Sequence, residues 1–172
     1  GRPQGDPMIN SASLERVGVL DLVSGHKGHV IVTSAGFDGM PSDENGRLEN
    51  AVKMVDQCRD RNISLDRIHI DPLLFPISVD QTFGNHYLEA VRLMRMEFGE
   101  EVRITGGLSN VSFGLPSRRL INDTFIRLAI DAGVDSGILN PIESNWSRVM
   151  GLNMESDRVK IAMDMLLGRD EF

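Results

Sequence analysis

The sequence predicts an α/β fold in which parallel strands alternate with helices. Three observations support this prediction. Short apolar runs alternate along the chain with longer amphipathic segments, each strand-like run ends in polar residues, and no linker or repeat interrupts the pattern. Because consecutive parallel strands need a crossover connection, the alternation favours helices that return the chain to the start of the next strand.

The strand-like runs are short and rich in β-branched residues. The clearest is 29–33 (HVIVT), which is bounded by glycines, and the run 67–71 (RIHID) is stopped by Pro72. The segments between the runs repeat apolar residues at helical spacing. In chain order we expect strands at 8–11, 29–33, 67–71, 102–105 and 136–140, and helices at 14–22, 48–58, 79–99, 120–132 and 159–167.

Polar residues gathered at the carboxyl ends of parallel strands are typical of the site of a (β/α)8 barrel. Such a barrel has eight strands and typically about 250 residues, whereas this chain has 172 residues. An open, five-stranded, doubly wound sheet is the alternative that fits the length. The polar strand ends are Asn10, residues 33–34, Asp71, residues 109–110 and Asn140.

The most polar connection is the loop 106–118, which follows the strand at 102–105 and precedes a helix. It combines a glycine pair, serine hydroxyls, an amide at Asn110 and a guanidinium at Arg118. A plain strand-to-helix turn needs fewer donors and acceptors. In α/β folds, ligands bind where such loops leave the strands, so we expect a ligand here.

Composition excludes several classes of function. The net charge of −7 and the pI near 5.0 argue against a general binder of nucleic acid or of anionic membranes. No apolar run approaches the roughly 18 residues of a membrane span. The single cysteine, Cys58, cannot form an internal disulfide, which favours a reducing, cytoplasmic location. His26 and His29 have the spacing of some metal ligands but lack a nearby third ligand, so no metal site is predicted.

Several motifs in the right order resemble a known family. MINS at 8–11, IDPL at 70–73 and GLSNVS at 107–112 resemble the pterin-binding methyltransferases, which include methyltetrahydrofolate:corrinoid methyltransferases and the folate domain of cobalamin-dependent methionine synthase. Arg118 and LIN at 120–122 continue the match. Separate motifs in a fixed order are more specific than any one of them.

The resemblance implies a (β/α)8 barrel of the dihydropteroate synthase-like type, of which this chain, as a single domain over 1–172, would supply strands four to eight. Strands one to three, with an acidic pterin ligand on the third, are expected upstream of Gly1. Dihydropteroate synthases carry a Ser-Arg-Lys phosphate motif on the seventh strand loop, where this chain has LSNVS. The difference favours methyl transfer over pterin condensation.

The same resemblance implies roles for individual residues. Asp71 and Asn10 would bind the pterin edge, because a carboxylate accepts paired N–H bonds and an amide matches the remaining groups. Gly107 and Ser109 would shape the loop, Arg118 would lie near the folate, and Asn140 would complete the wall. The simpler alternatives are a turn cap for Asp71, strand-end or turn hydrogen bonds for the asparagines, and a surface position for Arg118.

Asn110 matches the family asparagine that approaches N5 of the pterin. Departure of that nitrogen requires protonation or strong hydrogen bonding as its bond to the methyl group breaks. An amide cannot be the proton source, but it can donate a hydrogen bond to the protonated form. Asn110 is therefore the predicted catalytic residue, and cob(I)alamin on a partner protein would be the nucleophile.

The sequence thus leads to one principal hypothesis and two alternatives. The principal hypothesis is an enzyme that moves a methyl group from N5 of methyltetrahydrofolate, or a related tetrahydropterin, to a corrinoid protein. The alternatives are a dihydropteroate synthase-like enzyme and a non-catalytic pterin-binding or scaffold fragment. A partial barrel exposes strand edges that favour association with another chain, so we also expect a homodimer.

Overall fold

The computed structural model describes residues 5–170, so both ends of the expected 1–172 domain lie outside it. Its centre is one sheet of four parallel strands that lie side by side in chain order. Each strand is short, and the last is held by very few ladder bonds. The strands are β1 (Met8–Ala12), β2 (His29–Thr33), β3 (Ile68–Asp71) and β4 (Arg103–Ile104).

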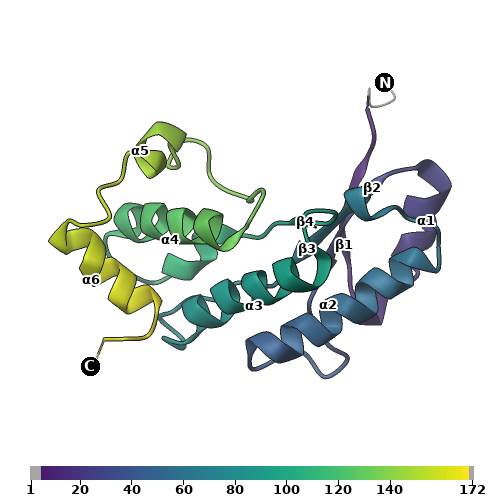
Figure 1. Ribbon diagram of the computed structural model, residues 1–172, viewed down its shortest axis with the longest axis horizontal. Helices are drawn as coiled ribbons and strands as arrows, with labels where there is room; N and C mark the ends of the chain where they lie inside the picture. Colours follow the sequence, from purple (N-terminus) through teal and green to yellow (C-terminus); the bar gives the residue numbers. More distant parts are fainter. Residues whose placement is uncertain (1–4, 171–172) are drawn as a thin grey trace.

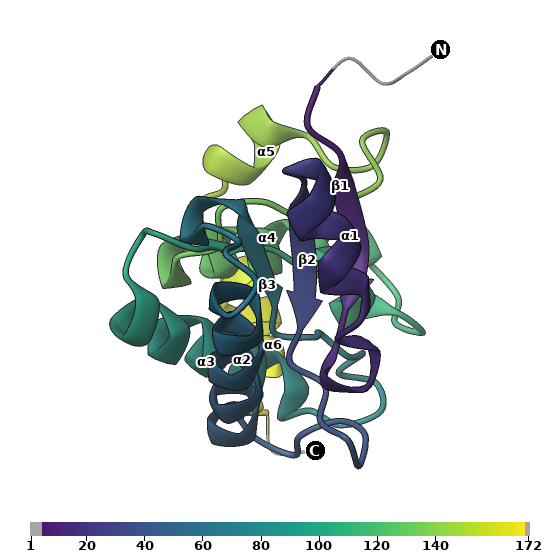
Figure 2. The ribbon, with the colours of Figure 1, turned by 90° about the vertical axis from the view of Figure 1, so that its right-hand side faces the viewer.

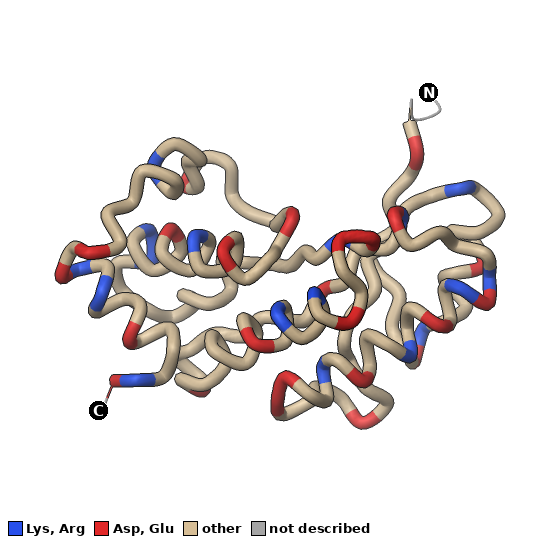
Figure 3. Tube along the Cα trace, in the orientation of Figure 1, with Lys and Arg blue, Asp and Glu red and all other residues tan. Residues whose placement is uncertain are grey.

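Helices occupy the connections between the strands, as the apolar spacing predicts. Charged residues of both signs are interspersed along them (Figure 3). No helix in the described part of the chain combines the length and apolarity needed to cross a membrane. The α-helices are α1 (Val19–His26), α2 (Glu44–Arg59), α3 (Phe83–Phe98), α4 (Arg118–Ala132), α5 (Trp146–Met150) and α6 (Asp157–Leu166), and short 3-10 helices are η1 (Leu14–Arg16), η2 (Leu65–Arg67) and η3 (Leu108–Ser112).

The strand order distinguishes the two predicted architectures. A doubly wound sheet reverses its strand order at a switch point, whereas here the order is β1-β2-β3-β4 without reversal. Because crossovers between parallel strands are right-handed, an unreversed order places every connecting helix on the same side of the sheet. In Figure 2, α1 and α2 lie in front of the strands. Within residues 5–170, this is the topology of part of a barrel, as predicted.

The fifth predicted strand, 136–140, is wrong as a strand assignment. The segment has no regular secondary structure, although the N–H of Ile138 donates to the carbonyl of Gly106, two residues after β4, over 2.8 Å. Because β4 has only two residues, the segment lacks the ladder partners that would make it a strand. The predicted helix at 14–22 is also interrupted at 17–18, and α5 was not predicted.

The two faces of the sheet differ in character. On one face, Val30, Val32, Ile68 and Ile70 are fully buried and join the core with residues from the helices. Side chains alternate along a strand, so His69 and Asp71 point to the opposite face, where both are half-buried. The helix-covered face therefore supplies stability, and the other face carries polar groups.

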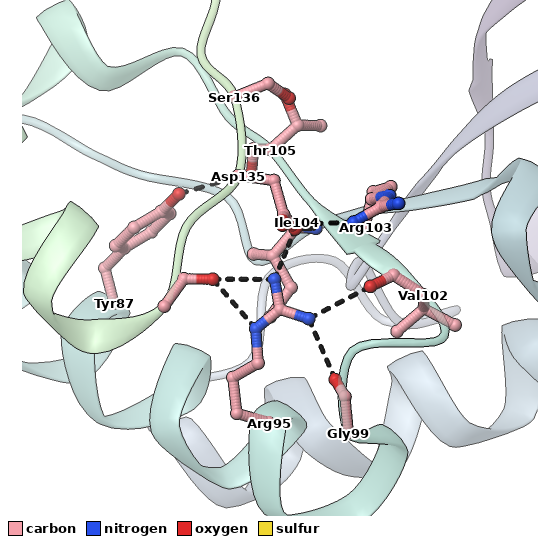
Figure 4. Close-up of polar contacts among 10 residues, drawn as sticks. Tyr87, Arg95, Gly99, Val102, Arg103, Ile104, Thr105, Asp135 and Ser136 are labelled. Carbon is pink, nitrogen blue, oxygen red and sulfur yellow. Dashed lines mark hydrogen bonds and ion pairs between the residues drawn. The ribbon is translucent and has the colours of Figure 1, made fainter.

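Arg95, on α3, fixes the position of β4 (Figure 4). Its guanidinium donates to the carbonyls of Gly99 and Val102, over 2.8 and 3.0 Å, and its Nε and Nη2 both donate to the carbonyl of Gly133, over 2.8 and 2.7 Å. It also pairs with the carboxylate of Asp135. Figure 1 shows the positions of α3, α4 and β4. Arg95 joins the carboxyl-terminal ends of the two helices to the entrance of the strand.

The carboxylate of Asp135 completes this arrangement. Its Oδ2 accepts a hydrogen bond of 2.7 Å from the backbone N–H of Ile104, the last residue of β4. Ser136 follows and donates its hydroxyl to Thr105 Oγ1 over 3.0 Å. The two-residue strand is thus positioned by side chains as much as by its backbone ladder.

We expect Arg95→Met to lower the free energy of unfolding by about 2–4 kcal/mol, because it leaves a carboxylate and several partly buried carbonyls without their donor. Urea denaturation measures this loss. Arg127→Met is the matched control, since Arg127 makes an i,i+4 pair with the exposed Asp131 and should cost less than about 1 kcal/mol. Equal losses in the two variants would contradict the role assigned to Arg95.

Candidate functional site

Asp71 is the last residue of β3 and lies half-buried at the carboxyl edge of the sheet. Its Oδ1 accepts a hydrogen bond of 2.8 Å from the N–H of Leu73, and its carbonyl accepts one of 3.0 Å from the N–H of Ser34. Burial raises the pKa of the Asp71 carboxyl from 3.8 to about 6, and the Leu73 hydrogen bond opposes this shift. A carboxylate with incomplete hydration at a strand end is well suited to accept hydrogen bonds from a ligand.

Gly106 allows the backbone of the loop after β4 to lie close to the side chain of Asp71. A Cβ at position 106 would lie 2.7 Å from Tyr87 Oη and 3.3 Å from Asp71 Oδ1. The first distance is shorter than any ordinary carbon–oxygen contact, so the close approach requires glycine. The structure therefore places the start of the predicted loop directly beside the predicted pterin carboxylate.

Tyr87 is a member of this cluster that the sequence interpretation missed. It is fully buried, and its hydroxyl donates to the carbonyl of Thr105 over 3.2 Å. Burial, together with the nearby charge of Asp71, raises the pKa of the Tyr87 phenol well above its usual value. Tyr87 is the only tyrosine of the chain and lies on the buried face of α3, which is a signal that could have pointed to it.

Asn110 lies in η3, three residues after Gly107. Its side chain is exposed and folds toward Gly107, where a Cβ would lie 2.9 Å from Asn110 Nδ2. The N–H of Asn110 also donates to the carbonyl of Gly107 over 3.0 Å. The glycine therefore leaves room for the amide, and the amide stays accessible at the end of β4.

Arg118, the first residue of α4, stabilises η3 through hydrogen bonds to two of its serines. Its Nε donates to Ser112 Oγ over 3.0 Å and its Nη2 donates to the carbonyl of Ser109 over 3.1 Å. Its guanidinium also lies 5.9 Å from the centre of the Phe113 ring. In this structure Arg118 and Ser109 stabilise the loop that carries Asn110, and their predicted contact with substrate stays a prediction.

Asn10 and Asn140 are both exposed and are less closely associated with this cluster. Asn10 lies within β1 and pairs with Ile31 on β2, while Thr33 pairs with Asp71. Paired residues share a face, so Asn10 and Asp71 point to the same side of the sheet.

Asn140 makes a local turn. Its Oδ1 accepts a hydrogen bond of 3.1 Å from the N–H of Ile142, which agrees with the simpler alternative of a turn hydrogen bond for this asparagine. No hydrogen bond joins Asn10 or Asn140 to Asp71 or Asn110 within residues 5–170.

Two histidines lie on the same face of the sheet as Asp71, His29 at the start of β2 and His69 two residues before Asp71 on β3. His29 Nδ1 and His69 Nε2 are 3.2 Å apart, within hydrogen-bond distance, and His26 instead contacts the carbonyl of Leu22. Among the described residues, no group of three or more histidine, cysteine, aspartate or glutamate side chains is arranged to hold a metal ion.

The raised pKa of Asp71 predicts a pH-dependent stability. In the folded protein the carboxyl of Asp71 has a pKa of about 6, whereas in the unfolded chain it loses its proton near pH 4. The contribution of Asp71 to stability is therefore largest below about pH 4 and falls by about 2 kcal/mol as the pH rises to about 6. Urea unfolding of the native protein and Asp71→Asn across this range measures the effect.

The asparagine variant keeps the oxygen that accepts from Leu73 but cannot ionise. Its stability relative to the native protein should therefore increase between pH 4 and pH 6 and then level off. Parallel stability curves for the two proteins would show that Asp71 titrates normally in the folded state.

Comparison with known proteins identifies relatives, although no family model matches the chain. The chain is 33% identical over 132 residues to the methylcorrinoid:tetrahydrofolate methyltransferase of Eubacterium limosum, and the match covers 77% of this chain and 45% of that protein. It is 26% identical over 156 residues to the methionine synthase of Mycobacterium tuberculosis, covering 86% of this chain and 13% of that protein. The chain thus spans less than half the length of these two relatives.

Solved structures agree on the fold. A dihydropteroate synthase of Coxiella burnetii in complex with pteroic acid superposes with a TM-score of 0.63 at 18% identity, over 94% of this chain and 60% of that one. The dihydropteroate synthase of Yersinia pestis gives a TM-score of 0.60 at 15% identity with the same coverage. These likenesses show the fold, which with the unreversed parallel sheet is part of a dihydropteroate synthase-like barrel. The sequence relatives show that the chain belongs to the pterin-binding, dihydropteroate synthase-like family.

Proposed function

We propose that the protein transfers a methyl group from N5 of methyltetrahydrofolate, or a related tetrahydropterin, to the cobalamin of a corrinoid protein. The observation that carries the proposal is the close approach of Asp71 to the loop that holds Asn110. The carboxylate of Asp71 and the loop that carries the Asn110 amide lie at one edge of the sheet, which supports a pterin-binding role for the first and a role at N5 for the second. The methylcorrinoid relative supports the same chemistry.

Asp71 supplies the recognition of the pterin edge. At neutral pH its carboxyl, with a pKa of about 6, is ionised although it is largely removed from water. A poorly hydrated carboxylate gains more from N–H donors than a solvated one, because it gives up less hydration when it binds. Its Oδ1 already accepts from Leu73, which fixes the direction of the group. Asn10, on the same face, would add an amide to this recognition.

Asn110 acts at the reacting nitrogen. Its exposed amide would donate a hydrogen bond to N5 and stabilise the protonated nitrogen that departs from the methyl group. A reduced corrinoid supplies the nucleophile for this transfer. The η3 turn, held by Arg118 through Ser112 and Ser109, keeps the amide in place. Gly107 gives the amide its room, and Asn140 lines the outer edge of the same site.

The exposure of Asn110 also suits the proposed partner. A corrinoid carried by another protein must come close to the methyl group, so the reacting edge has to be open. We further propose that the chain forms one domain, that two copies associate, and that the protein works in the reducing cytoplasm. The single buried thiol, Cys58, supports the reducing location, and the open edges of a partial sheet support association between copies.

Asn110→Ala should reduce methyl transfer far more than it reduces folate binding. Removing a donor used mainly as the bond breaks is expected to lower kcat by about 100-fold and to change the Kd for methyltetrahydrofolate by less than about threefold. Transfer to free cob(I)alamin is followed by absorbance, and binding is followed by titration. Asn45→Ala, which removes an exposed amide on α2 away from the candidate site, is the matched control.

Two results would contradict this assignment. If Asn110→Ala lost binding and transfer equally, Asn110 would be a ground-state contact instead of a catalytic residue. If the native protein bound methyltetrahydrofolate but transferred no methyl group, a non-catalytic pterin-binding role would replace the proposed enzyme.

A further inference from the structure

A buried arginine on α2 has no role in the function described so far. Arg47 is fully buried, and its Nε donates to the carbonyl of Pro72 over 3.1 Å. Its Nη1 is also buried and has no hydrogen-bond partner within residues 5–170. A buried guanidinium is costly unless fully paired, and an apolar residue of similar volume often stabilises a fold more. Stability alone therefore does not explain Arg47.

The carbonyl that Arg47 contacts belongs to the turn that carries Asp71. Pro72 follows Asp71 directly, and Leu73 then adopts a left-handed backbone conformation with φ of +64°. That conformation is unfavourable for leucine and persists only where the surroundings enforce it. The turn is held from two sides, by Asp71 Oδ1 on the N–H of Leu73 and by Arg47 on the carbonyl of Pro72.

Arg47 holds this turn without neutralising Asp71. No ion pair joins the two side chains among the described residues. Burial lowers the pKa of Arg47, and the charges of Asp43, the N-cap of α2, and Glu44, its first residue, oppose this shift. Glu44 itself is bonded to His86 over 2.5 Å. The carboxylate of Asp71 therefore stays available for a ligand while the backbone that carries it is fixed.

The same face of α2 contacts the neighbouring strand end. One turn after Arg47, Asn50 donates its Nδ2 to the carbonyl of Ser34 over 3.1 Å. Ser34 follows β2, and its N–H donates to the carbonyl of Asp71. Two side chains of one helix thus set the ends of two adjacent strands, and Arg47 is the one that contacts the Asp71 turn.

We propose that Arg47 is a positioning residue that holds the Asp71–Leu73 turn in its pterin-binding conformation. The proposal rests on the function proposed above, since it assumes that Asp71 binds the pterin. Arg47 touches no substrate. It acts through the backbone of Pro72, and its loss would allow Leu73 to relax and Asp71 to leave its place.

The variants Arg47→Met and Arg47→Lys test the proposal. Arg47→Met should remain folded by its urea unfolding transition, yet bind methyltetrahydrofolate about tenfold more weakly. The amide hydrogen of Leu73 should also exchange faster. Arg47→Lys retains a donor for Pro72 and should recover part of the affinity. Arg92→Met, at an exposed arginine paired with Glu89, is the matched control and should change neither quantity.

A second substitution separates positioning from a general packing role. Glycine adopts the left-handed conformation without penalty, so adding Leu73→Gly to Arg47→Met should recover most of the lost affinity. Native affinity in Arg47→Met, or a loss that neither Leu73→Gly nor Arg47→Lys recovers, overturns the proposal. If Arg47→Met does not fold, Arg47→Lys takes its place in the test. An affinity of Arg47→Lys below the native value that Leu73→Gly raises supports the proposal, and a loss that Leu73→Gly does not recover overturns it.

Failure of the proposed function gives a different result. A native protein that does not bind methyltetrahydrofolate rejects the methyl transfer proposal, whatever the variants do. Exchange of the Leu73 amide hydrogen then still tests Arg47, because it needs no ligand. Unchanged exchange in Arg47→Met rejects the positioning role, and faster exchange supports it.

Discussion

The guanidinium of Arg95 is the interaction on which the position of the candidate site depends. β4 has two residues, too few for a backbone ladder alone to fix its direction or its exit. Arg95 binds Val102 at the entrance of the strand and Asp135 beside it, and Asp135 in turn binds Ile104 at the exit. Because the glycine pair begins two residues later, any movement of β4 would move the whole loop away from Asp71.

A second constraint acts on the other side of the site. The turn after β3 contains a leucine in a left-handed conformation, and it is held by one hydrogen bond from within the turn and one from α2. The two sides of the site are therefore fixed by arginines from different helices, the half-buried Arg95 for the loop after β4 and the fully buried Arg47 for the turn after β3. Charged side chains thus fix two backbone segments, the loop after β4 and the turn after β3, that lie beyond the hydrogen-bond ladder of the sheet.

Much of the fold follows from local patterns in the sequence. The β-branched run at 29–33 and the proline after Asp71 predict β2 and β3, and the observed strands have nearly these bounds. Asp71, Gly107 and Asn110 could be chosen because strand ends and glycine-rich turns are visible along the chain. Their place at one edge of the sheet follows from its parallel strands, whose carboxyl ends meet there.

The features that sequence patterns missed depend on contacts between distant residues. The segment 136–140 has the composition of a strand, but its neighbour is too short to pair with it. Tyr87 and Arg47 lie on helices, where spacing indicates burial but not which strand end a polar atom will reach. Arg118 carries a charge that suggests a ligand, whereas its bonds within η3 show that it also organises the loop.

The pKa of Asp71, near 6 in the free protein, would link the proposed recognition of a pterin to proton release. A ring that donates N–H groups to the carboxylate stabilises its ionised form and lowers that pKa again. In mildly acidic solution, association therefore expels a proton from Asp71, and the apparent affinity rises with pH until the carboxyl is already ionised. Above that pH the ligand binds an ionised carboxylate that is already poorly hydrated. The N–H groups of the ligand then replace the water that burial has removed.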